Sequence, residues 1–270
     1  MVTFRIGLSL MLMVVLVAVM SARVESLVIQ GPELEEFLRQ AEIVGAKGID
    51  TGKTAPTKLT MEHNGVTRYA VFKSIDDERA IMKFDDGRID SNFRDSWRSE
   101  IAAYEIDKIM GLGMVPATVE RTYKGKKGSV QFWVDTMMSE AEHMRQKIEA
   151  PDIEDWNQRM FKTRVFDNLV YNMDRNLNNL LITREWEIVL IDHSRAFRPF
   201  SFLKSPKILE RFSRSMLEGM RRLNKENLTE KTGKYLPKNQ IEGLLQRRDE
   251  ILKLAEKMAA EMGEAVVYYP

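Results

Sequence analysis

Residues 171–192 combine several short polar side chains with apolar segments on both sides. Asp174 lies in a loop after a predicted helix, Asn179 begins a predicted strand, and Asp192 ends the next strand after the apolar run IVLI. In a two-strand hairpin, the start of the first strand lies beside the end of the second. We therefore expect Asn179 and Asp192 to be neighbours. Their amide and carboxylate oxygens are ligands that hard divalent cations accept. The spacing therefore predicts a cation site beside a further carboxylate, Asp174.

Phosphoryl transfer from ATP needs such a site, together with a fixed cation that holds the phosphates and a carboxylate that holds this cation. Lys73 follows the strand RYAVF, so its ammonium can project from a sheet toward a cleft. Glu100 begins a predicted helix and is placed to pair with Lys73 or to reach the metal. The segment Gly45–Gly52 is a candidate for approaching phosphates, although Lys47 stands where a Walker A loop has its first glycine.

Each of these residues also has a simpler interpretation. Asp174 and its asparagine-rich surroundings are typical of a helix C-terminal turn, and Asp192 of a turn at a strand end. Lys73 resembles a solvated strand lysine, and Lys83 in AIMKF competes with it for the phosphate-binding role. Glu100 resembles an ordinary first-turn acid near a helix dipole. The combination, rather than any one member, favours phosphoryl transfer.

Hydrophobic periodicity predicts strands in the first half of the chain and mainly helices in the second. Asn64-Gly65 is a two-residue hairpin signal between two alternating runs. The elements predicted for the first half are a helix at 32–40, strands at 42–49, 57–63, 66–74, 117–123 and 129–135, a hairpin within 75–93, and a helix at 96–110. Those predicted for the second half are a helix at 153–171, a hairpin of 179–183 and 187–192, and a terminal helix with an apolar stripe from 241 to 262. The GKKG stretch at 125–128 is predicted to be the turn before the strand at 129–135.

The first 26 residues differ from the rest. Arg5 precedes an uncharged apolar run over residues 6–20, and small residues follow it. This pattern predicts a secretory signal peptide within residues 1–26. A retained membrane anchor is the alternative, although the run is shorter than the ~20 residues that a spanning helix needs. We therefore expect an exported or secretory-pathway protein, or one that is membrane-anchored through residues 6–20.

Composition narrows the functional classes further. The formal net charge is +1 and the hydrophobic fraction is 44%, which suits a folded protein with a sizeable core. Lys and Arg are spread along the chain, so no nucleic-acid partner is expected. The absence of cysteine excludes disulfides, thiolate zinc sites and cysteine nucleophiles. The stretch Lys204–Arg222 is rich in basic residues, which favours a solvated face over a site for an acidic substrate or a membrane.

Four segments resemble atypical kinases, in the right order, over about residues 45–200. FDNLVYNMDRNLNNLLI followed by VLIDHSRAF is similar to their catalytic and metal-binding segments, and RYAVFK to the strand with the nucleotide-binding lysine. RSEIAAYEIDKIMGLGMVPATVER is similar to their inserted helix and the next strand. The resemblance is to the secretory-pathway (Golgi casein-type) kinases and, more loosely, to phosphatidylinositol kinases and HipA-type toxin kinases.

The resemblance implies roles for individual residues. Asp174 resembles the catalytic aspartate, while Asn179 and Asp192 match the residues that bind metal. Lys73 resembles the phosphate-binding lysine and Glu100 the helix glutamate. The segment from Gln131 to Met137 would be the hinge beside adenine, with Gln131, Asp135 and Met137 as further cofactor-binding residues.

The resemblance also implies a fold and an activity. The fold is expected to be α+β and two-lobed, protein-kinase-like, with a small β-rich lobe at residues 27–137 that carries one inserted helix and a mainly helical lobe at 138–270. The cofactors would be ATP with Mg²⁺ or Mn²⁺, and the partner a hydroxyl-bearing protein, glycan or lipid acceptor.

Three departures from the secretory kinases concern the acceptor more than the fold. This chain lacks their disulfide framework and is shorter, and Asp192-His193-Ser194 stands where they have Asp-Asn-Gly. A pseudokinase that binds nucleotide or a protein partner without turnover remains the alternative. A purely structural interaction protein and a cytosolic toxin-like kinase are the other hypotheses.

Overall fold

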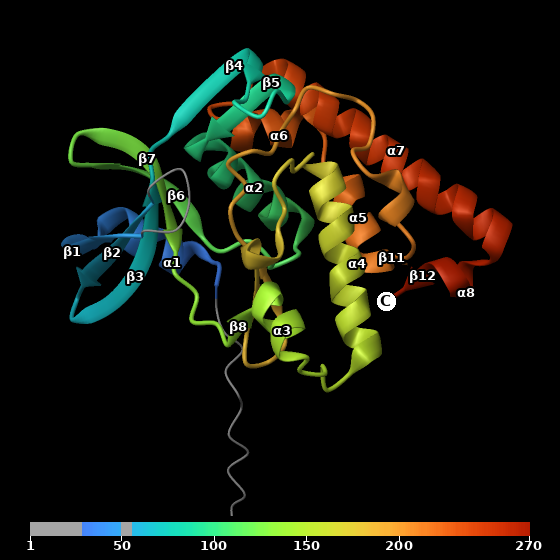
Figure 1. Ribbon diagram of the computed structural model, residues 1–270, viewed down its shortest axis with the longest axis horizontal. Coiled ribbons are helices and arrows are strands. Elements are labelled where there is room, and N and C mark those ends of the chain that lie inside the picture. Colours follow the sequence, from blue (N-terminus) through green and yellow to red (C-terminus); the bar gives the residue numbers. More distant parts are fainter. Residues whose placement is uncertain (1–28, 50–55) are drawn as a thin grey trace, which may run out of the picture.

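The computed structural model describes residues 29–49 and 56–270. The predicted signal peptide or anchor at 1–26, and residues 50–52 of the segment proposed to approach phosphates, lie outside these residues. Figure 1 shows a β-rich part at one side of the molecule and a helical part at the other. Among the described residues, no helix has both the length and the apolar character needed to cross a bilayer.

An antiparallel five-stranded sheet, in the order β1-β2-β3-β7-β6, forms the centre of the first half. Its strands are β1 (Glu42–Gly48), β2 (Thr57–His63), β3 (Val66–Lys73), β6 (Thr118–Tyr123) and β7 (Lys126–Phe132). Asn64 and Gly65 both have positive φ, 50° and 75°, and form the predicted turn between β2 and β3. The helix α1 (Pro32–Gln40) contacts β2, β6 and β7.

Between β3 and the inserted helix the chain forms a separate hairpin, β4 (Asp76–Lys83) and β5 (Ile89–Ser96). It extends to the side of the sheet that faces α6, as Figure 1 shows. The inserted helix α2 (Trp97–Met110) follows at once. Ser96 caps its start by accepting a hydrogen bond from the Arg98 amide, and Gly111, with a φ of 71°, ends it.

The second half contains most of the helices. A small sheet in the order β10-β9-β8 lies beside them and carries the loops with the predicted metal ligands. The elements are β8 (Met138–Ser139), α3 (Glu140–Gln146), α4 (Ile153–Leu169), β9 (Leu180–Ile182), β10 (Ile188–Leu190), β11 (Phe212–Ser213), α5 (Arg214–Arg222), α6 (Lys225–Thr232), α7 (Lys238–Met262), α8 (Glu264–Val267) and β12 (Tyr268–Tyr269), with short 3₁₀ helices at Leu177–Asn179 and Pro206–Ile208.

Several predicted boundaries were wrong. The hairpin predicted within 75–93 extends to Ser96, the last residue of β5. The predicted strand 129–135 is β7, which begins at Lys126 and ends at Phe132, because the turn lies at Lys124-Gly125, both with positive φ. The predicted helix 153–171 ends at Leu169, since Tyr171 takes a φ of 52°. The predicted hairpin strands 179–183 and 187–192 are shorter, because Asn179 lies in a 3₁₀ turn and Asp192 has a φ of 60°.

One continuous apolar cluster connects the two halves. It runs from the sheet through α2 to α4, α5 and α7, with fully buried members such as Leu59, Ile106, Phe166, Met220 and Leu244. Because α2 contributes to both sides of this cluster, its position relative to the second half is set by packing. The side chains at the start of α2 are therefore carried on a rigid element.

Candidate active site

The ammonium of Lys73 lies between two carboxylates. Lys73 Nζ is 2.5 Å from Glu100 Oε1 and 2.8 Å from Asp192 Oδ1. Glu100 is fully buried, and the side chain of Lys73 is 15% exposed. The three residues come from the end of β3, the first turn of α2 and the loop after β10. The structure therefore brings together the cation and the two acids that the sequence places in one site, and Glu100 takes the first of its two predicted contacts.

Lys73 is held in place by the backbone of the sheet. It is the last residue of β3 and pairs with Ser129 of β7. The preceding residue of β7 is Gly128, where a Cβ atom would overlap the Lys73 carbonyl and the Phe72 ring. The glycine therefore allows the two strands to approach closely at this point.

Glu100 is positioned from two directions. The Ser96 cap fixes the start of α2, so that Glu100 falls in its first turn. The second carboxylate oxygen of Glu100 accepts a hydrogen bond of 3.0 Å from the His193 backbone amide. Glu100 thus connects the sheet to the loop that follows β10.

The charges of Lys73, Glu100 and Asp192 change one another's pKa. Burial opposes the charge on Lys73, but Glu100 and Asp192 outweigh it and raise the pKa of this lysine. Burial would also raise the pKa of Asp192, yet Lys73 more than compensates and holds it below the ordinary value. The pKa of Glu100 is raised, because its complete burial outweighs the attraction of Lys73. Lys73 and Asp192 are therefore charged at neutral pH.

Asp192 and Asn179 are neighbours, as the hairpin prediction requires. Asn179 Nδ2 lies 3.4 Å from Asp192 Oδ2 and 3.3 Å from the Asp174 carbonyl oxygen. If the side-chain amide of Asn179 is flipped, its oxygen takes the place of Nδ2 beside Asp192. Asp192 and Asn179 can thus supply two oxygen ligands.

This donor set fits Mg²⁺, which usually takes one or two protein carboxylates and completes its shell with water and substrate phosphates. Within residues 29–49 and 56–270, no group of three or more His, Asp or Glu side chains is arranged to hold a metal by itself.

Asp174 lies on the exposed side of the same loop. Its backbone amide donates a hydrogen bond of 3.1 Å to Asn172 Oδ1, which shapes the turn. Its carboxylate is half exposed, and Oδ2 lies 3.4 Å from Arg195 Nη1. Asp174 does not contact Lys73, Glu100 or Asp192 through its side chain. It is thus placed to meet a group that arrives from solvent.

Arg175 braces the loop, and the sequence argument did not assign it a role. Its guanidinium binds both oxygens of Asp167, with Nε 3.0 Å from Oδ2. Nη1 donates to the carbonyl oxygens of Asn179 and Ile191, and Nη2 to His193 Nε2. One planar cation therefore joins α4 to the loop that carries Asp174 and to the loop after β10.

His193 is a buried support rather than a base. Burial, reinforced by the charges of Arg175 and Lys73, lowers the pKa of His193 well below its ordinary value, so the ring is neutral. Because Arg175 can only donate, Nε2 is the acceptor and Nδ1 carries the proton. Nδ1 has no hydrogen-bond partner among the described residues and lies 3.9 Å from Glu100 Oε2.

A second buried arginine, on α7, supports the end of α4 and the segment that follows Asp192. Arg247 of α7 donates to the carbonyl oxygens of Leu169, Arg198 and Phe200, and its guanidinium carbon lies 5.3 Å from the centre of the Tyr171 ring. The local signal for this residue is weak: an arginine among the mainly apolar residues on the buried face of the last helix.

The three predicted hinge residues do not form a cluster like that of Lys73, Glu100 and Asp192. Gln131 is buried in β7, and its Nε2 donates to Thr118 Oγ1 at 2.9 Å. Asp135 and Met137 are exposed in the segment that joins β7 to β8, where the Met137 amide donates to the Ile182 carbonyl. The segment connects the two halves of the chain beside β9.

Lys83, the alternative to Lys73, is exposed on β4. It has no hydrogen bond with Glu100 or Asp192, whose shared cation is Lys73.

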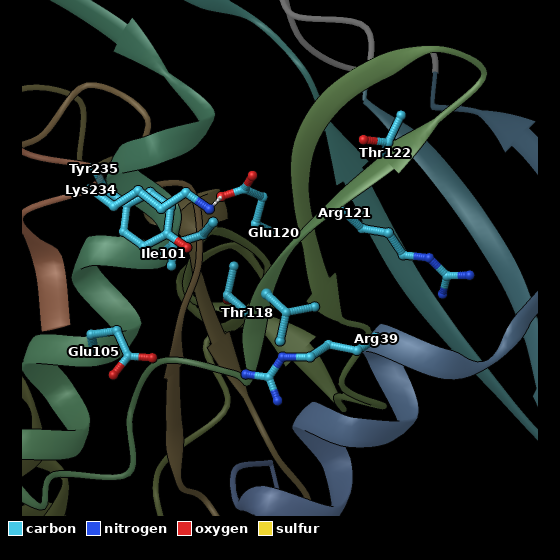
Figure 2. A pocket seen from close by; sticks show the side chains of 10 residues that line it. Arg39, Ile101, Glu105, Thr118, Glu120, Arg121, Thr122, Lys234 and Tyr235 are labelled. Carbon is cyan, nitrogen blue, oxygen red and sulfur yellow. Dashed lines mark ion pairs between the residues drawn. The ribbon is translucent and has the colours of Figure 1, made fainter.

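A hollow of about 400 Å³ lies on another face of α2 and is lined by α1, α2, β6 and the turn after α6. Figure 2 shows Arg39 and Glu105 on its one side and the Lys234–Glu120 ion pair on the other. Arg39 also pairs with Glu35. None of the predicted site residues lines this hollow.

Comparison with known proteins gives two results. No protein-family model matches the sequence, and no curated protein matches it. Among solved structures, the Golgi casein kinase superposes with a TM-score of 0.59 and 17% identity, covering 87% of this chain and 76% of that one. The fold is that of an atypical kinase. The Helicobacter pylori proinflammatory kinase CtkA superposes with a TM-score of 0.52 and 15% identity, covering 83% of this chain and 98% of that one.

The kinase-like fold confirms the predicted fold class, and the resemblance to Golgi casein-type kinases is confirmed at the level of the fold. In the terms of this fold, the sheet with α2 is the smaller, β-rich part, and the helices from α3 onward form the larger part. At these identities the likeness concerns the fold alone.

Proposed function

We propose that this protein is a kinase that transfers a phosphoryl group from ATP to a hydroxyl acceptor with the help of Mg²⁺ or Mn²⁺. One observation carries the proposal: Lys73, Glu100 and Asp192 come from three separate segments and form one charge cluster on a kinase-like fold. A lysine between a helix glutamate and a metal-binding aspartate is the arrangement that kinases use for nucleotide phosphates.

Each residue has a definite task in this proposal. Lys73 holds phosphate oxygens, and Glu100 keeps its ammonium in place from the buried side. Asp192 and Asn179 hold the metal, which when bound neutralises charge on the phosphates. Asp174, on the exposed side, orients the acceptor hydroxyl and accepts its proton as the new bond to phosphorus forms.

The acceptor is a hydroxyl on a protein, a glycan or a lipid, since all three present the same chemistry to Asp174. The N-terminal pattern adds the proposal that the enzyme works in the secretory pathway or outside the cell, or on a membrane to which residues 6–20 anchor it. A pseudokinase with the same fold would bind nucleotide but would not turn it over.

The test uses the full chain with radiolabelled ATP and Mg²⁺ or Mn²⁺, and follows label transfer to protein and release of phosphate. Asp174→Ala should retain metal-dependent ATP binding and lose at least about 100-fold in rate, because it removes the base. Asp192→Ala should lose both binding and rate. Asp249→Ala, an exposed acid on α7, is the matched control.

Three results would count against the proposal in different ways. Nucleotide binding without turnover in the wild type would support the pseudokinase. Turnover that survives in Asp192→Ala would place the metal site elsewhere. Failure of the wild type to bind any nucleotide would leave a kinase-like scaffold with another role.

A further inference from the structure

Arg195 lies three residues after Asp192 and brings a positive charge to the exposed side of the site. Its Nη1 is 3.4 Å from Asp174 Oδ2, which is the long end of a charged contact. The side chain is 25% exposed. The guanidinium therefore lies beside the carboxylate that is proposed to receive the acceptor, where it remains accessible from solvent.

The β4–β5 hairpin holds this guanidinium. Its carbon lies 5.1 Å from the centre of the Phe93 ring and 5.7 Å from that of Phe84. The two rings meet edge to face at 6.0 Å, so they form a fixed aromatic support. Cation–π contacts of this kind orient an arginine without using its hydrogen-bond donors.

The hairpin is itself fastened to the second half of the chain. Arg198, which is fully buried, lies 2.8 Å from Asp90 Oδ2 and also donates to the Asn92 carbonyl oxygen. Arg94 on β5 donates to the Tyr235 carbonyl oxygen at 3.0 Å. The aromatic support of Arg195 is therefore anchored on both sides.

The donors of Arg195 are largely uncommitted. Its Nε is buried and has no hydrogen-bond partner among the described residues. The weak contact with Asp174 is its one side-chain hydrogen bond there, and its charge also acts on the nearby Asp95 carboxylate. The other cations of the site are engaged: Lys73 with two carboxylates, and Arg175 with Asp167 and two carbonyls. A guanidinium with free donors beside a catalytic carboxylate suits an oxyanion.

We propose that Arg195 binds the phosphoryl group while it passes from nucleotide to acceptor, and that Phe84 and Phe93 hold it for this purpose. The proposal rests on the proposed function. As the bond from phosphorus to the β–γ bridging oxygen breaks, its electron pair stays with the nucleoside diphosphate. The acceptor oxygen bonds to phosphorus and its proton passes to Asp174. Arg195 stabilises the three equatorial oxygens, over which the negative charge of the transferred group is spread.

The test compares two ligands by calorimetry. ADP with Mg²⁺ and fluoroaluminate mimics the phosphoryl group in transit, whereas a non-hydrolysable ATP analogue with Mg²⁺ mimics the ground state. Arg195→Ala should weaken the first by at least about tenfold and the second by less than about threefold, and should lower the rate of ATP hydrolysis by about 100-fold or more. Arg195→Lys should recover part of the loss.

Two further variants separate the support from the charge. Phe93→Leu keeps an apolar side chain but removes the ring under the guanidinium, so it should weaken fluoroaluminate binding by less than Arg195→Ala does. Arg79→Ala removes an exposed cation of the same hairpin, which pairs with Asp77, and should bind both ligands like the wild type.

The ratio of the two affinities decides the outcome. Equal weakening of both ligands in Arg195→Ala would overturn the proposal, because a structural role predicts it. Unchanged fluoroaluminate binding and unchanged hydrolysis would overturn it as well. If the wild type binds the ATP analogue and hydrolyses ATP, either of these results in Arg195→Ala would overturn the role of Arg195 alone. The proposed function would still stand. A wild type that binds neither ligand would overturn both.

Discussion

Lys73 and Asp192 are 119 positions apart in the sequence, yet the ammonium of one lies 2.8 Å from a carboxylate oxygen of the other. The contact joins the end of a central strand of the sheet to the loop after β10. Glu100 completes the group from a third segment. One cation thus serves two carboxylates, and Asp192, which is the more exposed of them, remains open to a metal.

Loss of the ion pair between Lys73 and Glu100 should destabilise the protein strongly. In Lys73→Met the carboxylate of Glu100 loses its counterion while fully buried, so we expect a loss of about 3–5 kcal/mol in the free energy of unfolding. Lys83→Met, at an exposed lysine on β4, should change it by less than about 0.5 kcal/mol. Urea denaturation of both variants measures this, and similar losses would show that the Lys73 pair contributes no more than a surface lysine.

Arg175 should matter through its fork geometry. Arg175→Lys keeps the charge but cannot bind both oxygens of Asp167 and two carbonyls at once. We expect the variant to fold, to lose about 2 kcal/mol of stability, and to bind Mg²⁺-ATP at least about tenfold more weakly, because Asn179 and Asp192 lose their shared support. Arg184→Lys in the exposed β9–β10 turn is the control; an Arg175→Lys variant with wild-type ATP affinity would contradict the bracing role.

Gly128 should tolerate no side chain. The added methyl group of Gly128→Ala would overlap the Lys73 carbonyl and the Phe72 ring, so β7 and β3 must separate. We expect a loss of roughly 1–3 kcal/mol in stability and weaker nucleotide binding, since Lys73 is carried by the displaced strand. Gly48→Ala, at an open position of the same sheet, should be close to neutral. Thermal unfolding with and without Mg²⁺-ATP compares the two.

A buried acid at the far end of α2 should make stability depend on pH. Burial raises the pKa of Asp107 to about 7, although Gln30 and the amides of Gly113 and Met114 oppose the shift. The unfolded chain releases this proton near pH 3.8, so stability from this group is complete at low pH and declines as pH rises to about 7.

Asp107→Asn should remove this decline. Between pH 5 and pH 7 the wild type should lose roughly 2–3 kcal/mol relative to the variant, whatever the absolute cost of exchanging an oxygen for an amide nitrogen. Unfolding measured at several pH values gives both slopes. Parallel slopes would mean that the Asp107 carboxyl titrates near its ordinary pKa.

Much of the fold followed from local patterns. Alternating runs on either side of Asn64-Gly65 predicted β2 and β3, and helical periodicity predicted α2 to within one residue. Two of the errors, at the end of α4 and at the end of the second hairpin strand, occurred where contacts from other segments set the backbone conformation. Tyr171 and Asp192 take positive φ, which local propensity disfavours. Contacts from other segments fix their neighbours: the Phe197 amide donates to the Val170 carbonyl, and Arg175 to the Ile191 carbonyl.

The sequence by itself determined the residue types of the site and their order: a strand lysine, a helix-start glutamate, and two polar positions at the ends of a short hairpin. Periodicity and hairpin spacing are short-range properties, so they can be read along the chain. Tertiary structure alone decided that Lys73 meets both acids, that Arg175 and Arg247 support the loops, and that Phe84 and Phe93 lie under Arg195. These contacts join segments from different elements, and their energy comes from burying and pairing groups that have no local relation in the sequence.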